Sequence, residues 1–373
     1  MSSLKVAAIT DTSGGNTATI NSMTPTADSL QGFRNRLING SMVIDQRNAG
    51  AAVTANGSYV VDRFLVQNGT DGAFSAQQDT SAPVGFVNSI KWTTTTADGT
   101  LTTTQQASIQ QRIEGTNVSD LAFGTANAKT VTVSFWVRSS LTGTFGGSLR
   151  NSASDRSYPF TYSISVANTW EQKSVTIAGD TSGTWLTTTG IGLVVTWGLG
   201  AGPDRSGTAG AWNSNNNNTA TGAVSVIGTL NATWYITGAQ LEVGSVATPF
   251  ERRDYGRELM LCQRYYYKIK ATATDQEFGS GWNDSTTLSS CVIPLPVTMR
   301  VAPTALEQSG TASHYQIIYA NNAGTCTSVP TFASGSPFST RTNFYITSGL
   351  TAGQGSGARS TSSSAFLAWS AEL

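Results

Sequence analysis

The stretch Val131-Thr-Val-Ser-Phe-Trp-Val-Arg138 decides the fold class, because apolar and polar residues alternate along it. Successive side chains of a β-strand point to opposite faces, so this alternation predicts a strand with one buried face. The pattern recurs further along the chain, in the segments that begin at Phe160 and Ile191. Clusters of Gly, Asn and Asp separate the segments and predict tight turns. We therefore expect an all-β protein with a jelly-roll β-sandwich over residues 35–252.

The composition supports many short strands in more than one domain. The chain has 373 residues, and only 12% of them are charged. Thr, Ser, Gly, Ala and Asn take the place of charged residues, and Thr favours strands because its branched side chain suits a pleated surface. A chain of this length exceeds one compact β-domain, so we expect at least one further domain.

A helix and a second β-domain are expected after the jelly roll. Asp254 can cap a connecting helix over residues 253–268. The apolar residues of this helix follow one another at steps of four, three and four, and they are Tyr255, Leu259, Cys262 and Tyr266. This stripe is a candidate oligomer interface, and the alternative is that it packs on its own domain. Alternating residues resume afterwards and predict a smaller C-terminal β-sandwich over residues 269–373.

Residues 1–34 are expected to form a separate N-terminal arm, because they hold too few apolar residues to build a core. Two interpretations remain open for this arm: it adds to the sheet of a partner protein, or it is a loose tail. The candidate docking residues are Leu4, Val6, Ile9, Ile20 and Met23.

The sequence offers little material for catalysis, metal binding or cofactors. His314 is the one histidine, and no glycine-flanked serine nucleophile accompanies it. Cys262, Cys291 and Cys326 are widely spaced, which indicates buried, reduced thiols rather than a metal site. We expect no catalytic residue, no metal and no cofactor. A glycan depolymerase is kept as an alternative, although the chain lacks the short repeats of a parallel β-helix.

Two tryptophans are candidates for contact with a glycan. Trp212 lies in a long Gly- and Asn-rich loop over residues 198–222, and Trp282 lies in the C-terminal domain. An exposed indole can stack on a sugar ring, whereas the alternative for each tryptophan is a place in the core. The loop itself is expected to be a flexible surface arm or a contact with a neighbouring subunit or receptor.

Charge and hydropathy exclude several partners. The formal net charge is zero, from 22 basic and 22 acidic residues, so we expect no binding to nucleic acid. No stretch of eighteen apolar residues occurs, so we expect no membrane insertion. The first ten residues lack the pattern of a signal peptide. The protein is therefore expected to be made in the cytoplasm of its host cell and to leave it by lysis or within a particle.

Several motifs resemble a family of fibre-like and minor virion proteins of bacteriophages, of the kind found in marine or cyanobacterial phages. The segment 236–251 (Ile-Thr-Gly-Ala-Gln-Leu-Glu-Val-Gly-Ser-Val-Ala-Thr-Pro-Phe-Glu) is the most specific of them. The resemblance covers roughly residues 1–270, and looser similarity continues to the C-terminus. The other matching segments are 3–6, 36–47, 59–64, 133–138 and 257–266.

The resemblance implies a carbohydrate-binding-like jelly roll in a homotrimer that is attached to the virion by its N-terminal arm. It supplies no catalytic residue. The expected partners are other copies of the chain, virion proteins of the tail, neck or portal adaptor, and a glycan of the host surface. From the residues and the resemblance together we expect a fibre-like virion protein, with a capsid or neck decoration protein as the alternative.

Overall fold

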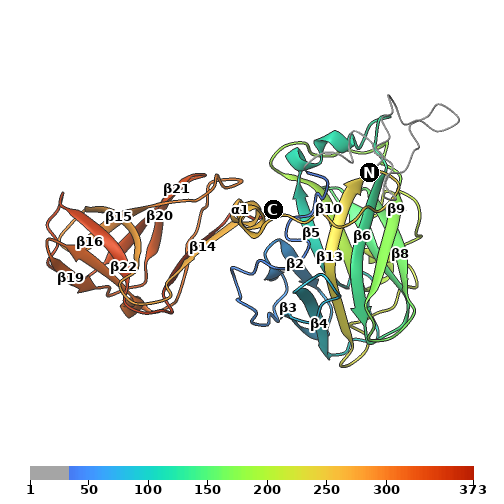
Figure 1. The fold of residues 1–373 in the computed structure, drawn as a ribbon, viewed down its shortest axis with the longest axis horizontal. Helices are drawn as coiled ribbons and strands as arrows, with labels where there is room; N and C mark the ends of the chain where they lie inside the picture. Colours follow the sequence, from blue (N-terminus) through green and yellow to red (C-terminus); the bar gives the residue numbers. More distant parts are fainter. Residues whose placement is uncertain (1–32) are drawn as a thin grey trace, which may run out of the picture. The chain divides into compact units, whose positions relative to one another are not determined.

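The computed structural model describes residues 33–373, which form two compact units with the boundary between Arg252 and Arg253 (Figure 1). Each unit is described by itself. Along this part of the chain, no helix is both long and apolar enough to cross a bilayer. Outside the described residues lie the candidate docking residues Leu4, Val6, Ile9, Ile20 and Met23.

Unit 1 is a jelly-roll β-sandwich of two antiparallel sheets, which confirms the predicted fold class. Consecutive strands repeatedly change sheets, as β4, β5, β6 and β7 do, and so the chain closes both sheets around one core. In spatial order, the six-stranded sheet contains β1 (Tyr59–Val61), β2 (Phe64–Asn68), β5 (Gln106–Glu114), β10 (Ile191–Ala201), β7 (Gly143–Arg150) and β8 (Ser157–Ile164). The five-stranded sheet contains β3 (Ala73–Asp79), β4 (Ser89–Thr96), β13 (Thr233–Val243), β6 (Val131–Ser139) and β9 (Glu171–Ile177).

Alternation along the strands fills the core of unit 1. In β6, Val133 and Phe135 are fully buried between the sheets, as their period of two predicts. Trp197 of β10 joins the two sheets: its ring centroid lies 6.2 Å from that of Phe64 in β2 and 5.8 Å from that of Phe135 in β6. Aromatic pairs at such distances add to the free energy gained by burying their area.

The Asn-rich loop does not project from unit 1 as an arm. β10 takes up the first glycines of the expected loop, and the rest, residues 202–222, folds back on the six-stranded sheet; we call it the covering loop. It holds the 3-10 helix η3 (Pro203–Arg205) and the paired strands β11 (Ser206–Gly207) and β12 (Thr219–Ala220). The loop approaches so closely because Gly146 and Gly198 lie beneath it: a Cβ on either glycine would fall within 2.5 Å of Thr219.

Unit 2 is a smaller β-sandwich with a core of its own. Cys262, Cys291 and Cys326 are buried, and within residues 33–373 none of them forms a disulfide. Burial raises the pKa of Cys291 to about 11 and that of Cys326 to about 12, which keeps both thiols protonated near neutral pH. One sheet contains β14 (Tyr266–Lys270), β23 (Phe366–Ser370) and β17 (Glu307–Gln308). The other contains β19 (Asn322–Thr325), β18 (Tyr315–Tyr319), β22 (Gly355–Ser360), β15 (Glu277–Asn283), β16 (Leu288–Pro294), β21 (Ser339–Tyr345) and β20 (Thr331–Ser336).

The predicted helix is present but shorter than residues 253–268. Helix α1 spans Tyr255–Gln263 and belongs to unit 2. The Asp254 side chain accepts a hydrogen bond from the backbone N–H of Arg257, as the predicted cap requires. The helix ends early because Tyr266 begins strand β14, where it pairs with Ser370.

Candidate functional site

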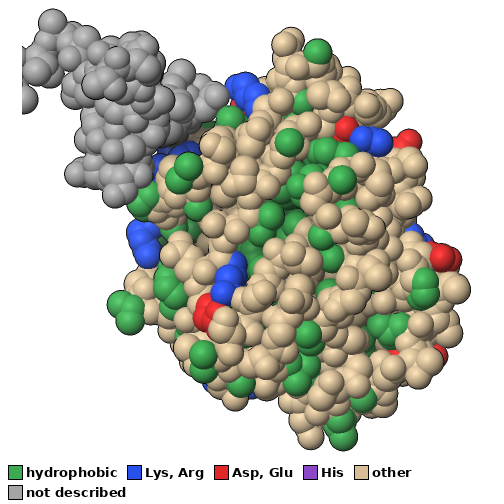
Figure 2. Space-filling model, turned by 90° about the vertical axis from the view of Figure 1, so that its right-hand side faces the viewer, with side chains coloured by type: hydrophobic (Ala, Val, Ile, Leu, Met, Phe, Trp, Pro, Cys, Tyr) green, Lys and Arg blue, Asp and Glu red, His purple; other side chains and the backbone are tan. Residues whose placement is uncertain are grey.

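The outer face of the six-stranded sheet is polar, although this chain is poor in charge. Along β5, the side chains of Gln106, Ser108, Gln110 and Arg112 point outward, and they alternate with inward, buried residues: Ala107 and Ile109 of the core, and Gln111. Few charged side chains show on the face of the molecule drawn in Figure 2. An arginine in a strand of this protein is therefore a local feature that calls for a physical explanation.

A groove of about 250 Å³ lies on this face, beside the covering loop. Val194 of β10 is part of its lining, and Arg205 and Asn216 of the covering loop contribute to it as well. Amide and guanidinium groups dominate the remaining surface, supplied by Gln67 of β2, Gln106, Gln110 and Arg112 of β5, and Arg150 of β7. The covering loop thus turns a flat sheet face into a concave site of the kind that small ligands occupy.

Arg150 is the most buried charge in the groove, with 6% of its surface exposed. Its two terminal nitrogens donate to amide oxygens, at 2.5 Å to Asn216 Oδ1 and at 3.2 Å to Gln110 Oε1. Nε has no hydrogen-bond partner among the described residues. Burial is the main cause that lowers the pKa of Arg150 to about 10, and the charges of Arg205 and Arg112 contribute to the same shift. Arg150 still carries its charge at neutral pH.

Under the covering loop lies a row of buried hydroxyl groups. Thr196 of β10 stands opposite Ser148 of β7, and Ser108 lies on the neighbouring strand β5. None of the three hydroxyl oxygens has a hydrogen-bond partner in the described part of the chain. A buried polar atom without a partner costs roughly 1–3 kcal/mol, so this row is a local weakness of the sandwich.

We expect Thr196→Val to leave the free energy of unfolding of unit 1 unchanged, or to raise it by up to about 1 kcal/mol, because it removes an unsatisfied hydroxyl. Thr94→Val is the matched control. Thr94 Oγ1 donates to Val226 O at 2.9 Å and accepts from Trp92 Nε1 at 3.2 Å, so its loss should cost about 1–3 kcal/mol. Urea unfolding measures both variants, and an equal loss of stability in both would contradict this account.

Trp212 lies outside the groove, in an aromatic cluster of unit 1. Its ring packs edge-on against Trp185, with centroids 5.4 Å apart, and against Phe123 and Tyr158. Its Nε1 donates to Ala178 O at 2.7 Å. Phe123 and Trp185 also line an apolar pocket of about 250 Å³. These contacts fix the orientation of the Trp212 indole.

Trp282 lies on strand β15 of unit 2 and is 39% exposed. Its Nε1 donates to Asp284 Oδ1 at 2.8 Å, and Asp284 Oδ2 accepts a 2.5 Å hydrogen bond from Ser290. These bonds hold the ring in one orientation at the surface. Trp282 is therefore a second, separate candidate for stacking on a sugar.

The four residues predicted to form an oligomer interface do not make one helical stripe. Tyr255 is 64% exposed, Leu259 is half-buried and Cys262 is fully buried. Tyr266 is buried on β14, where its hydroxyl donates to Glu307 at 2.9 Å.

His314 Nδ1 lies 2.9 Å from Ser309 Oγ in unit 2. Within residues 33–373, no cluster of three or more His, Cys, Asp and Glu side chains could hold a metal.

Within the motif 236–251, the carboxylate of Glu242 is buried in a cluster with Gln240, Thr248 and Arg34, which we call the latch. Glu242 is 1% exposed and accepts hydrogen bonds from Gln240 Nε2 at 2.8 Å and from the Thr248 N–H and hydroxyl at 2.9 and 2.5 Å. Arg34 Nε lies 3.5 Å from Glu242 Oε2, and its Nη2 donates to Pro249 O at 2.6 Å. The latch therefore ties the first described residues to the segment that leaves unit 1.

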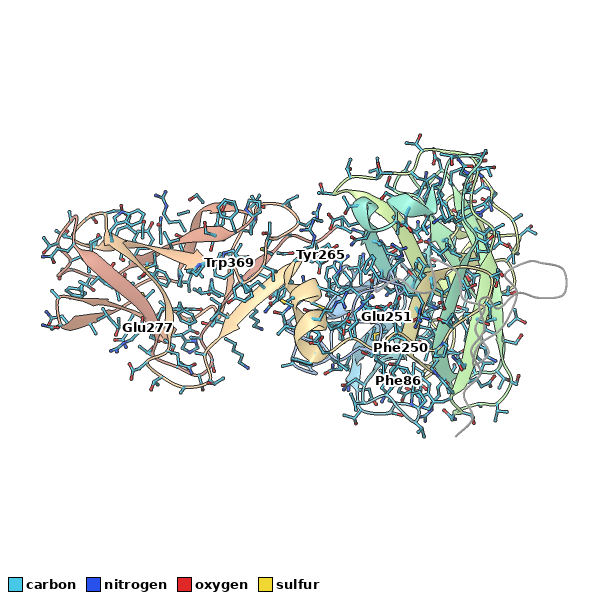
Figure 3. All side chains as sticks on the ribbon, turned by 45° about the horizontal axis from the view of Figure 1, so that its top comes forward. Phe86, Phe250, Glu251, Tyr265, Glu277 and Trp369 are labelled. Atoms are coloured by element: carbon cyan, nitrogen blue, oxygen red, sulfur yellow. The ribbon has the colours of Figure 1, made fainter. Side chains whose placement is uncertain are left out.

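An aromatic contact supports the segment that leaves unit 1, residues 249–252, which we call the exit segment. The rings of Phe86 and Phe250 meet edge to face with centroids 5.2 Å apart, and Glu251 lies beside them (Figure 3). The Arg252 guanidinium lies 4.8 Å from the Phe86 ring centroid, and its Nη2 donates to Gly85 O at 2.6 Å. The exit segment is thus fixed on the surface of unit 1 by polar and aromatic contacts together.

The sequence matches no protein-family model and no curated protein. Solved structures share the general fold at low similarity. A Bacteroides thetaiotaomicron protein described as sugar-binding is 12% identical, with a TM-score of 0.34 over 57% of this chain and all of that one. TmCBM61 in complex with β-1,4-galactotriose is 8% identical, with a TM-score of 0.29 over 57% of this chain and 99% of that one. The enzymatically active domain of bacteriophage CBA120 tailspike protein 4 is 12% identical, with a TM-score of 0.29 over 56% of this chain and 21% of that one. At such scores, none of these likenesses identifies a ligand.

The groove residues were not among the candidates found in the sequence. A signal was present, since every outward position of β5 from Gln106 to Arg112 is polar. Arg150 was a second signal of a polar site, because it is a charged residue at the end of a strand in a chain with few charged residues. What the sequence could not show is that the covering loop brings Arg205 and Asn216 over the same strands.

Proposed function

We propose that unit 1 binds a glycan in the groove beside the covering loop. The observation that carries this proposal is the lining: amide and guanidinium groups from three strands converge on one concave site. Sugar hydroxyls both donate and accept hydrogen bonds. The amide side chains of Gln and Asn offer a donor and an acceptor in one plane. Ligand sites combine a shaped cavity with a small number of placed polar groups, and this groove has that form.

We further propose that the chain is a non-enzymatic, fibre-like component of a bacteriophage virion and acts as a homotrimer. The resemblance of residues 236–251 and of the other quoted segments supports this role. The latch around Glu242 adds a physical reason, because it fixes Arg34, the last residue of the proposed docking arm, beside Pro249. The glycan would then belong to the surface of the host cell.

We expect Gln67→Ala to weaken glycan binding about five- to tenfold, because this factor corresponds to the free energy of one hydrogen bond lost between the protein and the glycan. Gln67 lies at the half-buried rim of the groove and accepts from Gln106 Nε2 at 3.1 Å. Gln172→Ala is the matched control, because Gln172 is exposed on β9 of the other sheet. A glycan array selects the ligand, and isothermal titration calorimetry compares the variants. Equal affinities of the two variants for that ligand would contradict the groove proposal.

The virion role is tested on purified phage particles. Antibodies against unit 2 and electron microscopy should place the chain at the tail or neck in a small number of copies. Hundreds of copies spread over the capsid lattice would instead support a decoration protein, and absence from the particle would contradict both roles. Light scattering of the purified chain tests the trimer, and a stable monomer would overturn it.

A further inference from the structure

The charged residues that line the groove are all basic. Arg112, Arg150 and Arg205 all line it, while no Asp or Glu of residues 33–373 belongs to its lining. The whole chain has as many acidic as basic residues, so this segregation is a property of the site and not of the composition. Three guanidinium groups around one hollow raise the local concentration of anions.

The surroundings of Arg150 differ from those of Arg156 in the same unit. Arg156 meets a carboxylate in bidentate geometry, with Nε and Nη2 both 2.7 Å from the oxygens of Asp180. Arg150 is more deeply buried, yet its hydrogen-bond acceptors are the neutral amides of Asn216 and Gln110. A buried charge that lacks an opposite charge is costly, and an anion arriving from outside would offset that cost.

The amides around Arg150 restrict the kind of anion. Gln110 and Asn216 hold the guanidinium in place, while Gln67 and Gln106 extend the site with groups that suit hydroxyls. A guanidinium matches the planar fork of a carboxylate. The groove therefore combines a position for a carboxylate with positions for the hydroxyl groups beside it.

We infer that the groove selects an acidic glycan, with a sugar carboxylate directed to Arg150 and Arg205. This inference rests on the proposed glycan binding and adds the class of sugar, one that bears a carboxylate such as a uronic acid. The hollow of about 250 Å³ suits a single sugar residue of a longer chain better than a whole oligosaccharide.

The test compares tetragalacturonate with its carboxyl-reduced form, which keeps the ring and linkage but lacks the charge. Isothermal titration calorimetry on the full chain should show that the acidic form binds at least about tenfold more tightly than the reduced form. Added salt should weaken the binding of the acidic form. Arg150→Gln and Arg205→Gln should each narrow this preference. Arg205→Gln is the variant less at risk of misfolding, because the Arg205 side chain is only half-buried whereas Arg150 is almost fully buried. Lys91→Gln is the control: it removes one positive charge from β4 in the other sheet.

Equal binding of the two forms would overturn the charge selection and leave the proposed glycan binding intact. Failure of tetragalacturonate to bind at millimolar concentration would also overturn it, whereas failure of every glycan on the array would overturn both proposals. A preference for the acidic form that both arginine variants retain would show that the carboxylate binds elsewhere.

Discussion

Replacing Trp197 by alanine should lower the free energy of unfolding of unit 1 by about 3–5 kcal/mol, the largest change that we expect from one substitution. Trp197 is fully buried and contacts Phe64 in its own sheet and Phe135 in the opposite sheet. Alanine would leave a cavity between the sheets that neither can close without moving its strands. Hydrogen exchange of β10 peptides during urea unfolding measures the loss in unit 1 alone.

Trp197→Phe is the matched control for this prediction. It keeps a ring between the two sheets and removes an indole N–H that has no hydrogen-bond partner within residues 33–373. We expect it to cost clearly less than the alanine variant. A loss below about 1 kcal/mol for Trp197→Ala would show that the sheets do not depend on this contact. Glycan binding should weaken with the alanine variant too, because β10 carries Val194 in the groove.

Glu242→Gln should destabilise unit 1 by about 2–4 kcal/mol although it hardly changes the shape of the side chain. Every group that Glu242 contacts in the latch is a donor: Gln240 Nε2, the Thr248 N–H and hydroxyl, and Arg34 Nε. A carboxylate accepts hydrogen bonds from Gln240 and Thr248 and forms an ion pair with Arg34, whereas the amide of glutamine would turn its own donors toward these groups.

The measurement for Glu242→Gln is the urea midpoint of unit 1 together with protease cleavage near Pro249. The exit segment should become accessible before the sandwich unfolds, because Arg34 loses its ion pair and keeps only its bond to Pro249 O. Asp204→Asn is the control, since Asp204 is exposed and should change stability by less than about 0.5 kcal/mol. Equal stability of the two variants would show that the latch is not needed for the fold.

The strands could be predicted because burial on one face leaves a period of two in the sequence. Val133 and Phe135 show this signal clearly, and both are fully buried. The helix cap at Asp254 was predictable for a similar reason, since it depends on residues three positions apart. The end of the helix was not, because Tyr266 is taken up by pairing with Ser370, more than a hundred residues later.

The groove could not be predicted because it depends on contacts between distant segments. Glycine and asparagine in the covering loop indicated turns, but nothing local showed that Asn218 and Thr219 would be buried. Their burial depends on Gly146 and Gly198, which leave space over the sheet. Trp212 was proposed from its type and its position in the loop, and the structure places it in an aromatic cluster away from the groove.

The most direct test of glycan binding in the groove is a crystal structure of the full chain with the oligosaccharide that binds most tightly on the array. We predict sugar density between Gln67, Gln110 and Arg150, with the covering loop in place beside it. Density stacked on Trp282 in unit 2, or in the apolar pocket beside Trp185, with none in the groove, would contradict the proposal.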